Sequence, residues 1–320
     1  MLTFNALSTA PVSSADDLSQ GLLAPQAHCS PKYFYNALGS TLFDAITHLP
    51  EYYLTRIEAA IFSDHAEAIH EQIPAQAAWL DLGAGSCEKA ARLFERTPPG
   101  LYVAVDISLD YLTGTLERLQ REHPKVPMVG VGMDFSSNLT FVPQLQAQLS
   151  AKPVFAFYPG SSLGNFDPVQ ALGFLQRIVG VCKAAQPGSG LLIGIDLVKD
   201  SAVLERAYAD ELGVTAAFNL NVLRHVNSLI GADFEVRDWE HLANFNVKES
   251  RIEMHLRARR EVAVSWPGHQ RVFQKGETIH TENSYKWTVE KFSKLLLSAG
   301  FTQTRHWTDE LERYAVFWAS

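Results

Sequence analysis

The sequence predicts an α/β protein with a largely parallel sheet, because strand and helix patterns alternate through the centre of the chain. Short apolar runs that are typical of buried strands recur at residues 78–83, 101–108, 126–135, 153–162 and 189–198. Helical patterns separate most of these runs, such as EKAARLFERT after the first one. Strands that alternate with helices usually pair in parallel through right-handed crossovers, which defines this fold class.

Residues 199–286 break this alternation and predict a segment inserted into the sheet unit. Residues 201–230 have a helical pattern with polar interruptions, and residues 234–265 alternate in the manner of antiparallel strands. The first pattern then returns, with a helix that Gly300 closes and two strands joined by a tight turn. We therefore predict a second, α+β unit within the α/β unit.

The N-terminal part predicts a loosely packed arm followed by helices. Residues 1–30 mix polar, small and apolar types without a clear period. Residues 31–73 have mostly helical spacing, and Pro50 divides them into at least two helices.

Composition and charge favour a globular protein that handles small molecules. Hydrophobic residues make up 47% of the chain and charged residues 19%, an ordinary globular balance. The formal net charge is -8 and no long Lys/Arg run is present, so the basic face that phosphate binding requires is not expected. Residues 1–17 lack a signal-peptide pattern, and no apolar run reaches the roughly 18 residues of a membrane span. We expect a cytoplasmic protein that binds neither nucleic acid nor membrane.

Cysteine spacing predicts neither disulfides nor a metal site. The three cysteines Cys29, Cys87 and Cys182 are far apart and form no CxxC pair. The histidines show no HExxH pattern. No bound metal is therefore expected.

The sharpest local motif is the loop DLGAGS at residues 81–86, between a predicted strand and a predicted helix. Glycines allow a tight turn and the close approach of a ligand, and a helix N-terminus behind them favours a carboxylate or phosphate. Asp106 ends the next predicted strand, where an acid can accept hydrogen bonds from both ribose hydroxyls. Asp134 and Phe135 follow the third strand and offer an acid and an aromatic ring to an adenine.

The loop departs from the dinucleotide pattern GxGxxG, because Glu88 holds the place of the third glycine. A nucleoside without a pyrophosphate needs less backbone clearance, which favours S-adenosylmethionine, and Lys89 is a candidate partner for its carboxylate. A nicotinamide or flavin nucleotide and a purely structural turn stay open. So do a helix cap at Asp106 and a solvated surface lysine at Lys89.

The chain resembles the L-histidine Nα-methyltransferases, the S-adenosylmethionine-dependent enzymes that begin ergothioneine biosynthesis. The resemblance covers residues 31–320 and is carried by PKYFYNALGSTLFDAITHLPEYYLTR, WLDLGAGSCEKAARLF, FYPGSSLGNFDP, AYADELGVTAAFNLNVLRHVN and IHTENSYKW. It implies a Rossmann-like S-adenosylmethionine methyltransferase sheet with an inserted α+β substrate-binding domain. The boundaries we predict are 1–60 for the N-terminal helical part of the substrate domain, 61–198 for the methyltransferase core, 199–286 for the inserted substrate-binding part and 287–320 for the end of the core.

The resemblance also implies the residues of the site. The implied cofactor contacts are Gly83, Lys89, Asp106, Asp134 and Phe135. The implied substrate contacts are Tyr52, Asn165, Tyr208, Glu282 and Ser284. Tyr35, near the amine, and Asn165 are the expected catalytic residues.

These residue types suit methyl transfer to histidine. The nitrogen must be unprotonated and face the methyl carbon at about 3–3.5 Å, so positioning carries much of the catalysis. Asn165 offers an acceptor and donors that can hold the amino group and the carboxylate together, and Tyr52 and Tyr208 are neutral donors. Glu282 can accept an imidazole N–H while Ser284 serves the other ring nitrogen, an arrangement that rejects analogues leaving these groups unsatisfied.

The sequence therefore predicts methylation of free L-histidine, taken to the trimethylated product hercynine, by a monomer. An Nα-methyltransferase of tryptophan or tyrosine is the nearest alternative, and a non-catalytic S-adenosylmethionine-binding module is another. Taken singly, each of these tyrosine, asparagine and glutamate positions is more often a packing, turn or solvated loop residue.

Overall fold

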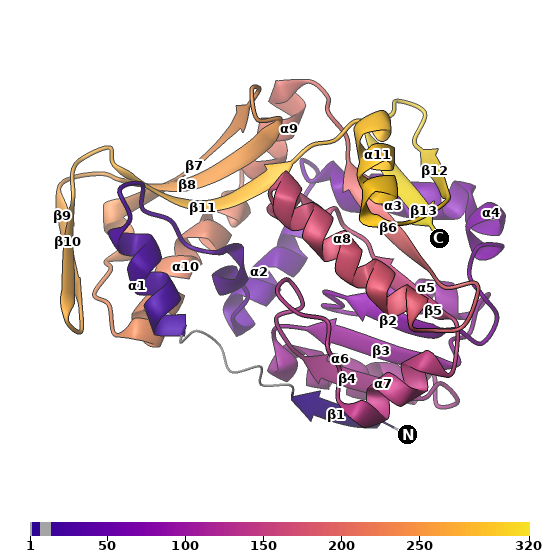
Figure 1. Ribbon diagram of the computed structural model, residues 1–320. Helices are drawn as coiled ribbons and strands as arrows, with labels where there is room; N and C mark the ends of the chain where they lie inside the picture. Colours follow the sequence, from indigo (N-terminus) through magenta and orange to yellow (C-terminus); the bar gives the residue numbers. More distant parts are fainter. Residues whose placement is uncertain (1, 7–13) are drawn as a thin grey trace. The chain divides into compact units, whose positions relative to one another are not determined.

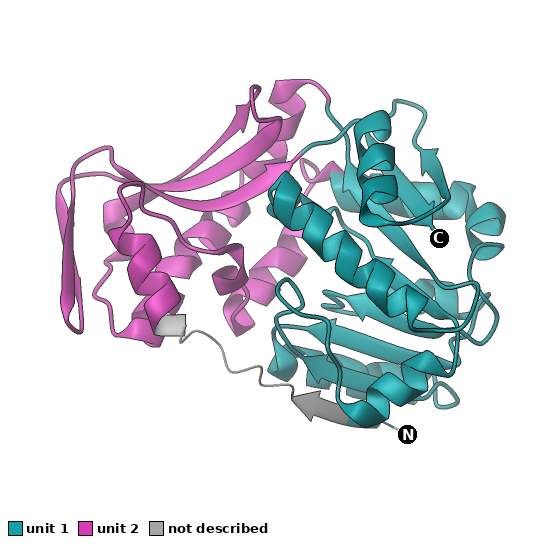
Figure 2. Ribbon diagram, in the orientation of Figure 1, with its two compact units in different colours: residues 1–8, 54–198, 286–320 teal, residues 9–53, 199–285 magenta. Residues whose placement is uncertain are grey.

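A computed structural model describes residues 2–6 and 14–320 of the chain (Figure 1). The chain divides into two compact units (Figure 2). Unit 1 comprises residues 1–8, 54–198 and 286–320, and unit 2 comprises residues 9–53 and 199–285. Each unit is thus assembled from segments that are far apart in the sequence.

Unit 1 is built on an eight-stranded sheet with the order β1-β4-β3-β2-β5-β6-β13-β12. Its strands are β1 (Leu2–Ala6), β2 (Ala78–Leu82), β3 (Leu101–Asp106), β4 (Met128–Gly132), β5 (Val154–Tyr158), β6 (Gly190–Asp196), β12 (Thr304–Thr308) and β13 (Tyr314–Ala319). Neighbours from β1 to β6 pair in parallel, and β13 and β12 continue the sheet as antiparallel strands. The predicted α/β sheet and its closing two strands are confirmed.

Helices cover this sheet, which is why its central strands are mostly apolar. They are α3 (Tyr53–Asp64), α4 (Ala66–His70), α5 (Glu88–Phe94), α6 (Leu109–Glu122), α7 (Pro143–Ser150), α8 (Pro168–Lys183) and α11 (Val289–Ala299). Every residue of β2, β5 and β6 is buried, as expected for parallel strands covered on both faces. Trp79 on β2 lies 4.6 Å from Phe155 on β5 between ring centroids, so large aromatic side chains fill the space beside the sheet.

The prediction of a loosely packed arm over residues 1–30 is wrong for the described part of that segment. β1 pairs in parallel with β4 at the edge of the sheet. Ser14–Leu23 forms helix α1, which buries Leu18 and Leu22 in unit 2. The Nε1 of Trp266 also donates to the Ser19 hydroxyl at 2.9 Å. The short edge strand β1 and the helix α1 are stabilised by partners that are distant in the chain, so their own residues show little periodicity. Residues 7–13 lie outside the described part.

Unit 2 packs helices against one face of an antiparallel sheet with the order β11-β8-β7. Its remaining elements are η1 (Pro31–Phe34), α2 (Ala37–Thr47), α9 (Ser201–Tyr208), α10 (Val214–Ile230), η3 (Val236–Asp238), β7 (Trp239–Asn246), β8 (Arg251–Ala258), the hairpin β9 (Val262–Trp266) and β10 (His269–Phe273), and β11 (Thr278–Tyr285). Alternate residues of β8 are buried, which confirms the half-buried antiparallel pattern predicted for this segment. Asn36 caps α2 by accepting from the Gly39 N–H at 2.8 Å and also accepts from Asn221 of α10 at 2.9 Å, so one side chain joins the two helices.

A buried ion pair marks the place where the chain leaves and re-enters unit 1. Lys286 and Asp196 are fully buried, and the Lys286 Nζ lies 2.9 Å from the Asp196 carboxylate. Beside them the Trp287 N–H donates to the Asp196 carbonyl at 3.2 Å, and the Val198 N–H donates to the Trp287 carbonyl at 3.0 Å. The two crossover segments are thereby fixed to each other within unit 1.

A second buried acid lies beneath the glycine loop. Asp81 on β2 is 2% exposed and accepts a hydrogen bond from the Tyr102 hydroxyl at 2.6 Å. Burial raises the pKa of Asp81 to about 7, the Tyr102 hydrogen bond opposes this rise, and the nearby Asp106 adds to it. The carboxyl group of Asp81 therefore holds a proton through much of the acidic range.

Replacing Lys286 with methionine should lower the free energy of unfolding by about 3–5 kcal/mol, because the buried Asp196 carboxylate loses the ammonium that balances its charge. Adding Asp196→Asn to the same protein should recover much of that loss, because both charges are then gone. Urea titration of the wild type and both variants measures the differences. A Lys286→Met protein as stable as the wild type would contradict the assigned ion pair.

The variant Asp81→Asn should remove a pH dependence of stability. The folded state retains the Asp81 proton up to about pH 7, whereas an unfolded chain releases it near pH 4. Between these values the folded state binds more protons, so this group lowers the free energy of unfolding as pH rises, by at most about 1.4 kcal/mol per pH unit. Relative to the wild type, the variant should gain stability from about pH 4 to about pH 7 and keep a constant advantage above it. If the free energies of unfolding of the two proteins differed by a constant amount from about pH 4 to about pH 7, the raised pKa of Asp81 would be refuted.

Candidate active site

The predicted site residues fall into two groups, one in each unit. Unit 1 contains Gly83, Lys89, Asp106, Asp134, Phe135 and Asn165, and unit 2 contains Tyr35, Tyr52, Tyr208, Glu282 and Ser284. In unit 1 all of them belong to strand ends, or to loops and helix starts that follow strand ends. Because β4, β3, β2 and β5 are parallel neighbours, their carboxyl ends share one edge of the sheet, where ligands bind in open α/β folds.

The glycine loop after β2 has the backbone shape that a close ligand requires. Gly83 and Gly85 have φ angles of +71° and +50°, in the left-handed region that favours glycine. The Gly85 N–H donates to the Asp106 carboxylate at 3.0 Å, so the loop is tied to the end of β3. A Cβ added to Gly83 would lie 3.5 Å from the ring of Phe135, which places this ring beside the loop. The residues present therefore leave a cradle that a larger side chain at Gly83 would fill.

Asp106 retains the capacity to bind a ribose. Its other oxygen accepts from the Ser108 N–H at 2.9 Å. Burial raises the pKa of Asp106, and these two backbone hydrogen bonds partly oppose the rise. Each carboxylate oxygen can accept two hydrogen bonds, so the pair of backbone donors leaves sites for hydroxyl groups.

Asp134 and Phe135 follow β4 at the same edge. Asp134 is half-buried and accepts from the Ser136 N–H at 3.1 Å, and the Ser136 hydroxyl donates to the same oxygen. The Phe135 ring meets Tyr158 edge-on at 5.9 Å between centroids. An acid of fixed position and a half-buried ring are suited to the edge and face of a purine.

Lys89 and Asn165 lie in helices that follow the neighbouring strands β2 and β5 of unit 1. Lys89 lies in the first turn of α5, and its Nζ donates to the buried Glu58 at 2.6 Å. Asn165 ends η2 (Ser162–Asn165), which follows two residues with left-handed backbone, Gly160 and Ser161. The Ser161 hydroxyl accepts from the Asp196 N–H at 2.9 Å, so the loop that carries Asn165 has a fixed path.

A β-bulge in unit 2 determines where Glu282 points. The register of β11 against β8 shifts between His280 and Glu282. As a result Thr281 and Glu282 are both buried, and Glu282 shares the buried face of the strand with Ser284. The Thr281 hydroxyl donates to Asn219 at 2.8 Å, which stabilises the extra residue.

Hydroxyl groups and aromatic rings of unit 2 extend from Ser284. The hydroxyls of Ser284 and Tyr208 are 2.7 Å apart and hydrogen-bonded. The Tyr208 ring meets Tyr52 at 6.4 Å, Tyr52 meets Phe43 at 6.3 Å, and Phe43 meets Tyr35 at 5.8 Å between centroids. The structure therefore brings four of the predicted residues of unit 2, Tyr35, Tyr52, Tyr208 and Ser284, into one continuous cluster.

Sequence reasoning missed two residues that touch predicted site residues, Phe43 and Glu58. Phe43 joins the rings of Tyr35 and Tyr52 and also packs on Phe218 at 5.9 Å. Glu58 occupies the buried face of α3, where Leu54, Ile57 and Ile61 are the expected apolar stripe. An acid on such a stripe is the signal that could have identified it.

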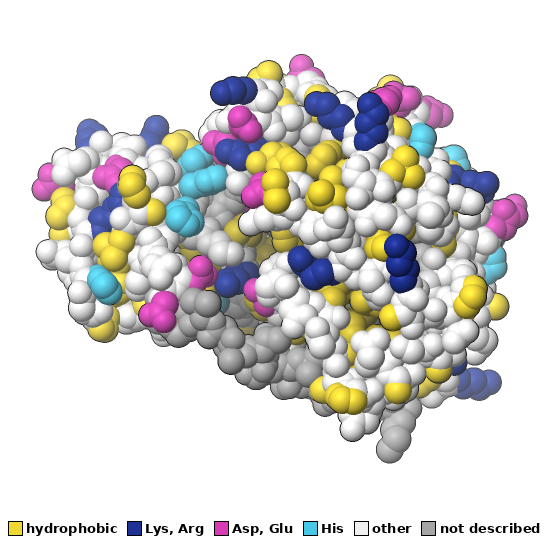
Figure 3. Space-filling model, viewed as in Figure 1, with side chains coloured by type: hydrophobic (Ala, Val, Ile, Leu, Met, Phe, Trp, Pro, Cys, Tyr) yellow, Lys and Arg dark blue, Asp and Glu magenta, His cyan; other side chains and the backbone are white. Residues whose placement is uncertain are grey.

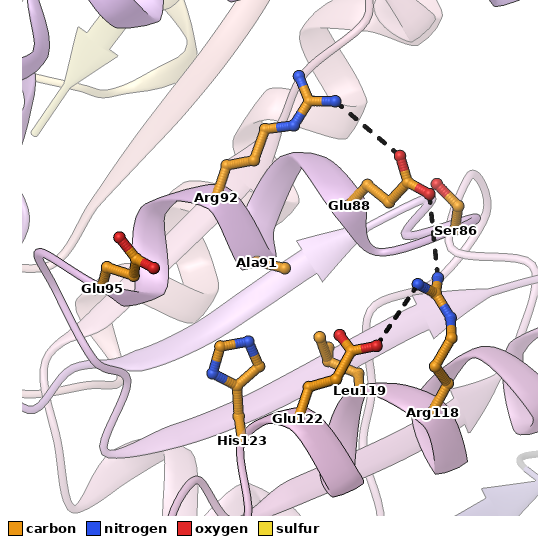
Figure 4. A pocket seen from close by; sticks show the side chains of 9 residues that line it. All are labelled: Ser86, Glu88, Ala91, Arg92, Glu95, Arg118, Leu119, Glu122 and His123. Atoms are coloured by element: carbon orange, nitrogen blue, oxygen red, sulfur yellow. Dashed lines mark ion pairs between the residues drawn. The ribbon is translucent and has the colours of Figure 1, made fainter.

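A surface hollow of about 470 Å³ lies between α5 and α6 and touches the glycine loop at Ser86 (Figure 4). It is lined by Ser86, Glu88, Ala91, Arg92, Glu95, Arg118, Leu119, Glu122 and His123. Four of its charged side chains, Glu88, Arg92, Arg118 and Glu122, are paired with one another, as in the Arg118–Glu88 contact of 3.9 Å. None of the predicted cofactor residues lines it. We assign it no ligand.

Comparison with known proteins identifies the family of this chain. The model of a family described as histidine-specific methyltransferase, SAM-dependent, matches residues 14–320. Histidine N-alpha-methyltransferases of Mycobacterium tuberculosis and Mycolicibacterium smegmatis are 39% and 38% identical, each covering 92% of this chain and 90% of the relative. Ergothioneine biosynthesis protein 1 of Neurospora crassa is 31% identical over 86% of this chain and 31% of the relative. With a parallel sheet whose glycine loop, acids and lysine stand at one edge, the chain belongs to the family of histidine-specific, S-adenosylmethionine-dependent methyltransferases.

Proposed function

We propose that the protein methylates the α-amino nitrogen of free L-histidine, and that three successive transfers give hercynine, the first step of ergothioneine biosynthesis. The observation that carries this substrate is the β-bulge of β11, which brings Glu282 and Ser284 to one buried face. A carboxylate and a hydroxyl on one face can pair both nitrogens of an imidazole. An amino acid without a second ring nitrogen could pair with only one of these two groups, so it would gain fewer hydrogen bonds on binding.

In this proposal unit 1 binds the cofactor. Bound S-adenosylmethionine supplies an electrophilic methyl group on a sulfonium. Gly83 allows its close approach to the backbone, Asp106 accepts from the ribose hydroxyls, and Lys89 binds the carboxylate. Asp134 and Phe135 hold the adenine. The left-handed loop at Gly83 and the Phe135 ring beside it support this assignment.

Unit 2 and Asn165 bind the amino acid in the same proposal. Tyr52 donates to the substrate carboxylate. Tyr208 can also donate to it when Ser284 is the donor in their shared hydrogen bond, and Ser284 then accepts from an N–H of the protonated imidazole. Asn165 holds the amino group with its carbonyl and the carboxylate with its amide. These neutral donors add no cation where a positive charge has to be accommodated.

Catalysis then consists mainly of orientation and proton removal. Asn165 and Tyr35 orient the amine so that its lone pair faces the methyl carbon, and the proton leaves to water, directly or through these residues. Each methyl group adds bulk, and the last one makes the nitrogen permanently cationic. The rings of Tyr35 and Phe218, 5.8 Å apart, can receive that cation on their faces.

We further propose that the protein acts as a cytoplasmic monomer on small molecules. Among residues 14–320, no helix is long and apolar enough to cross a membrane. On the face drawn in Figure 3, the described Lys and Arg side chains are scattered among acidic ones and form no continuous basic surface. This distribution and the net charge of -8 support a substrate other than nucleic acid.

Incubation with S-adenosylmethionine and L-histidine should yield trimethylhistidine, because the aromatic and neutral surroundings tolerate a growing cation. Mass spectrometry of the product, after parallel incubations with tryptophan and tyrosine, measures substrate and methyl number together. Methylation of tryptophan or tyrosine but not of histidine would overturn the substrate. Calorimetric binding of both ligands without any product would identify a binding module instead.

The variant Glu282→Gln should lower kcat/KM for histidine about 10- to 100-fold, because a charge-assisted hydrogen bond to the imidazole is lost. The ratio of kcat/KM for histidine to that for tryptophan should fall by a similar factor. Glu249→Gln removes the same charge from an exposed turn of unit 2 and serves as the matched control. An unchanged histidine-to-tryptophan ratio in Glu282→Gln would remove Glu282 from substrate recognition.

A further inference from the structure

One buried carboxylate in unit 1 accepts hydrogen bonds from three separate segments. Glu58 of α3 is 1% exposed. Its Oε2 accepts from the Lys89 Nζ at 2.6 Å, and its Oε1 accepts from the Gly160 N–H and from the Tyr314 hydroxyl, each at 2.7 Å. A carboxylate is a pure acceptor, so these three donors match its ionised form.

The surrounding chain is shaped to leave room for this carboxylate. A Cβ added to Gly194 of β6 would lie only 2.1 Å from the Glu58 Oε1. A Cβ added to Gly160 would lie 3.0 Å from the Lys89 Nζ. Two glycines thus bring backbone within contact distance of the charged atoms.

Fold stability alone does not account for a buried charge at this place. An ion pair removed from water is often no more stabilising than apolar side chains of the same volume. The neighbours of Glu58 on the same face of α3, Leu54 and Ile57, are apolar. What distinguishes Glu58 is that it contacts both Lys89 and the loop leading to Asn165.

We propose that Glu58 is a positioning residue for the cofactor, acting through Lys89 and Gly160. This inference rests on the proposed function, in which Lys89 binds the cofactor carboxylate. An ammonium has three donors, so the bond to Glu58 fixes Lys89 and leaves donors for that carboxylate. The Lys89 side chain is partly exposed, at 35%, whereas that of Glu58 is enclosed, which is the arrangement expected if Lys89 faces the ligand.

Glu58 also cancels the charge of Lys89, which matters for the choice between substrate and product forms of the cofactor. S-adenosylmethionine has one positive charge more than S-adenosylhomocysteine, on its sulfonium. An uncompensated Lys89 would repel that charge and favour the product. With Glu58 in place, the pair adds no net charge beside the cofactor.

The test compares Glu58→Gln with the wild type by calorimetric titration of both cofactor forms. The amide keeps the shape and removes the negative charge, and its NH2 group replaces an acceptor either toward Lys89 or toward Gly160 and Tyr314. We expect affinity for S-adenosylmethionine to fall at least about tenfold, and the ratio of its Kd to that of S-adenosylhomocysteine to rise about three- to tenfold. A purely structural role would weaken both ligands by the same factor, and that result, like wild-type values for both, would overturn the proposal.

Three further proteins complete the test. Glu58→Asp keeps the charge, so the wild-type ratio of the two Kd values should return even if both affinities weaken. Glu58→Gln combined with Lys89→Met removes both charges, and it should restore the ratio while lowering both affinities. If Glu58→Gln alone does not fold, this double variant replaces it in the test. Wild-type affinities for both cofactor forms in the double variant would exclude a role of the Glu58–Lys89 pair in cofactor binding. Glu122→Gln removes a charge from an exposed ion pair of unit 1 and controls for net charge.

These measurements are separable from the proposed function. The wild type is first titrated with both cofactor forms and assayed with histidine. A wild type that binds both forms but does not methylate histidine refutes the proposed substrate and still allows the Glu58 comparison. A wild type that binds neither form refutes the cofactor assignment and the Glu58 proposal with it.

Discussion

The parallel alignment of β4, β3, β2 and β5 is the constraint on which the cofactor half of the proposed site depends. Because parallel neighbours end at the same edge, the glycine loop, Asp106, Asp134 and the loop before Asn165 come together although they are distant in sequence. Hydrogen bonds then fix their relative positions: Gly85 is tied to Asp106 and Gly160 to Glu58. The sheet brings the segments into reach, and polar contacts between loops determine their geometry.

In unit 2, polar side chains have to reach the buried face of an antiparallel strand. A strand that packs against helices normally presents apolar residues to them. Strict alternation would place Glu282 on the same side as His280, which is half-buried. The one-residue shift at Thr281 transfers Glu282 to the buried side, and the bond from Thr281 to Asn219 compensates for the disturbed ladder. A local irregularity therefore positions two polar groups where a regular strand would bury apolar ones.

The features that could be predicted from the sequence are those that produce a local pattern of apolar and polar residues. The buried strands, the glycine loop and the acid at the end of β3 follow from apolar runs and from the residues that interrupt them. The strand β1, the bulge in β11 and the contacts of Glu58 depend on partners far away in the chain, and a register shift of one residue leaves no trace in composition. Glu58 shows this limit most clearly. Its position on an apolar helix face indicates a buried acid, but the sequence does not reveal that Lys89 is its partner.

The charges of unit 1 can be understood from the reaction that the family performs. Methyl transfer moves a positive charge from sulfur to nitrogen, so fixed charges near the path would favour one side of the reaction over the other. Lys89 is paired with Glu58, and in unit 2 the cluster of Tyr35, Tyr52, Tyr208 and Ser284 is neutral. Asp106, whose pKa burial raises, is held by backbone donors instead of by a cation. In unit 1 the charge of Lys89 is thus paired with Glu58 and Asp106 is held by backbone donors, while in unit 2 these four side chains add no charge beside Glu282.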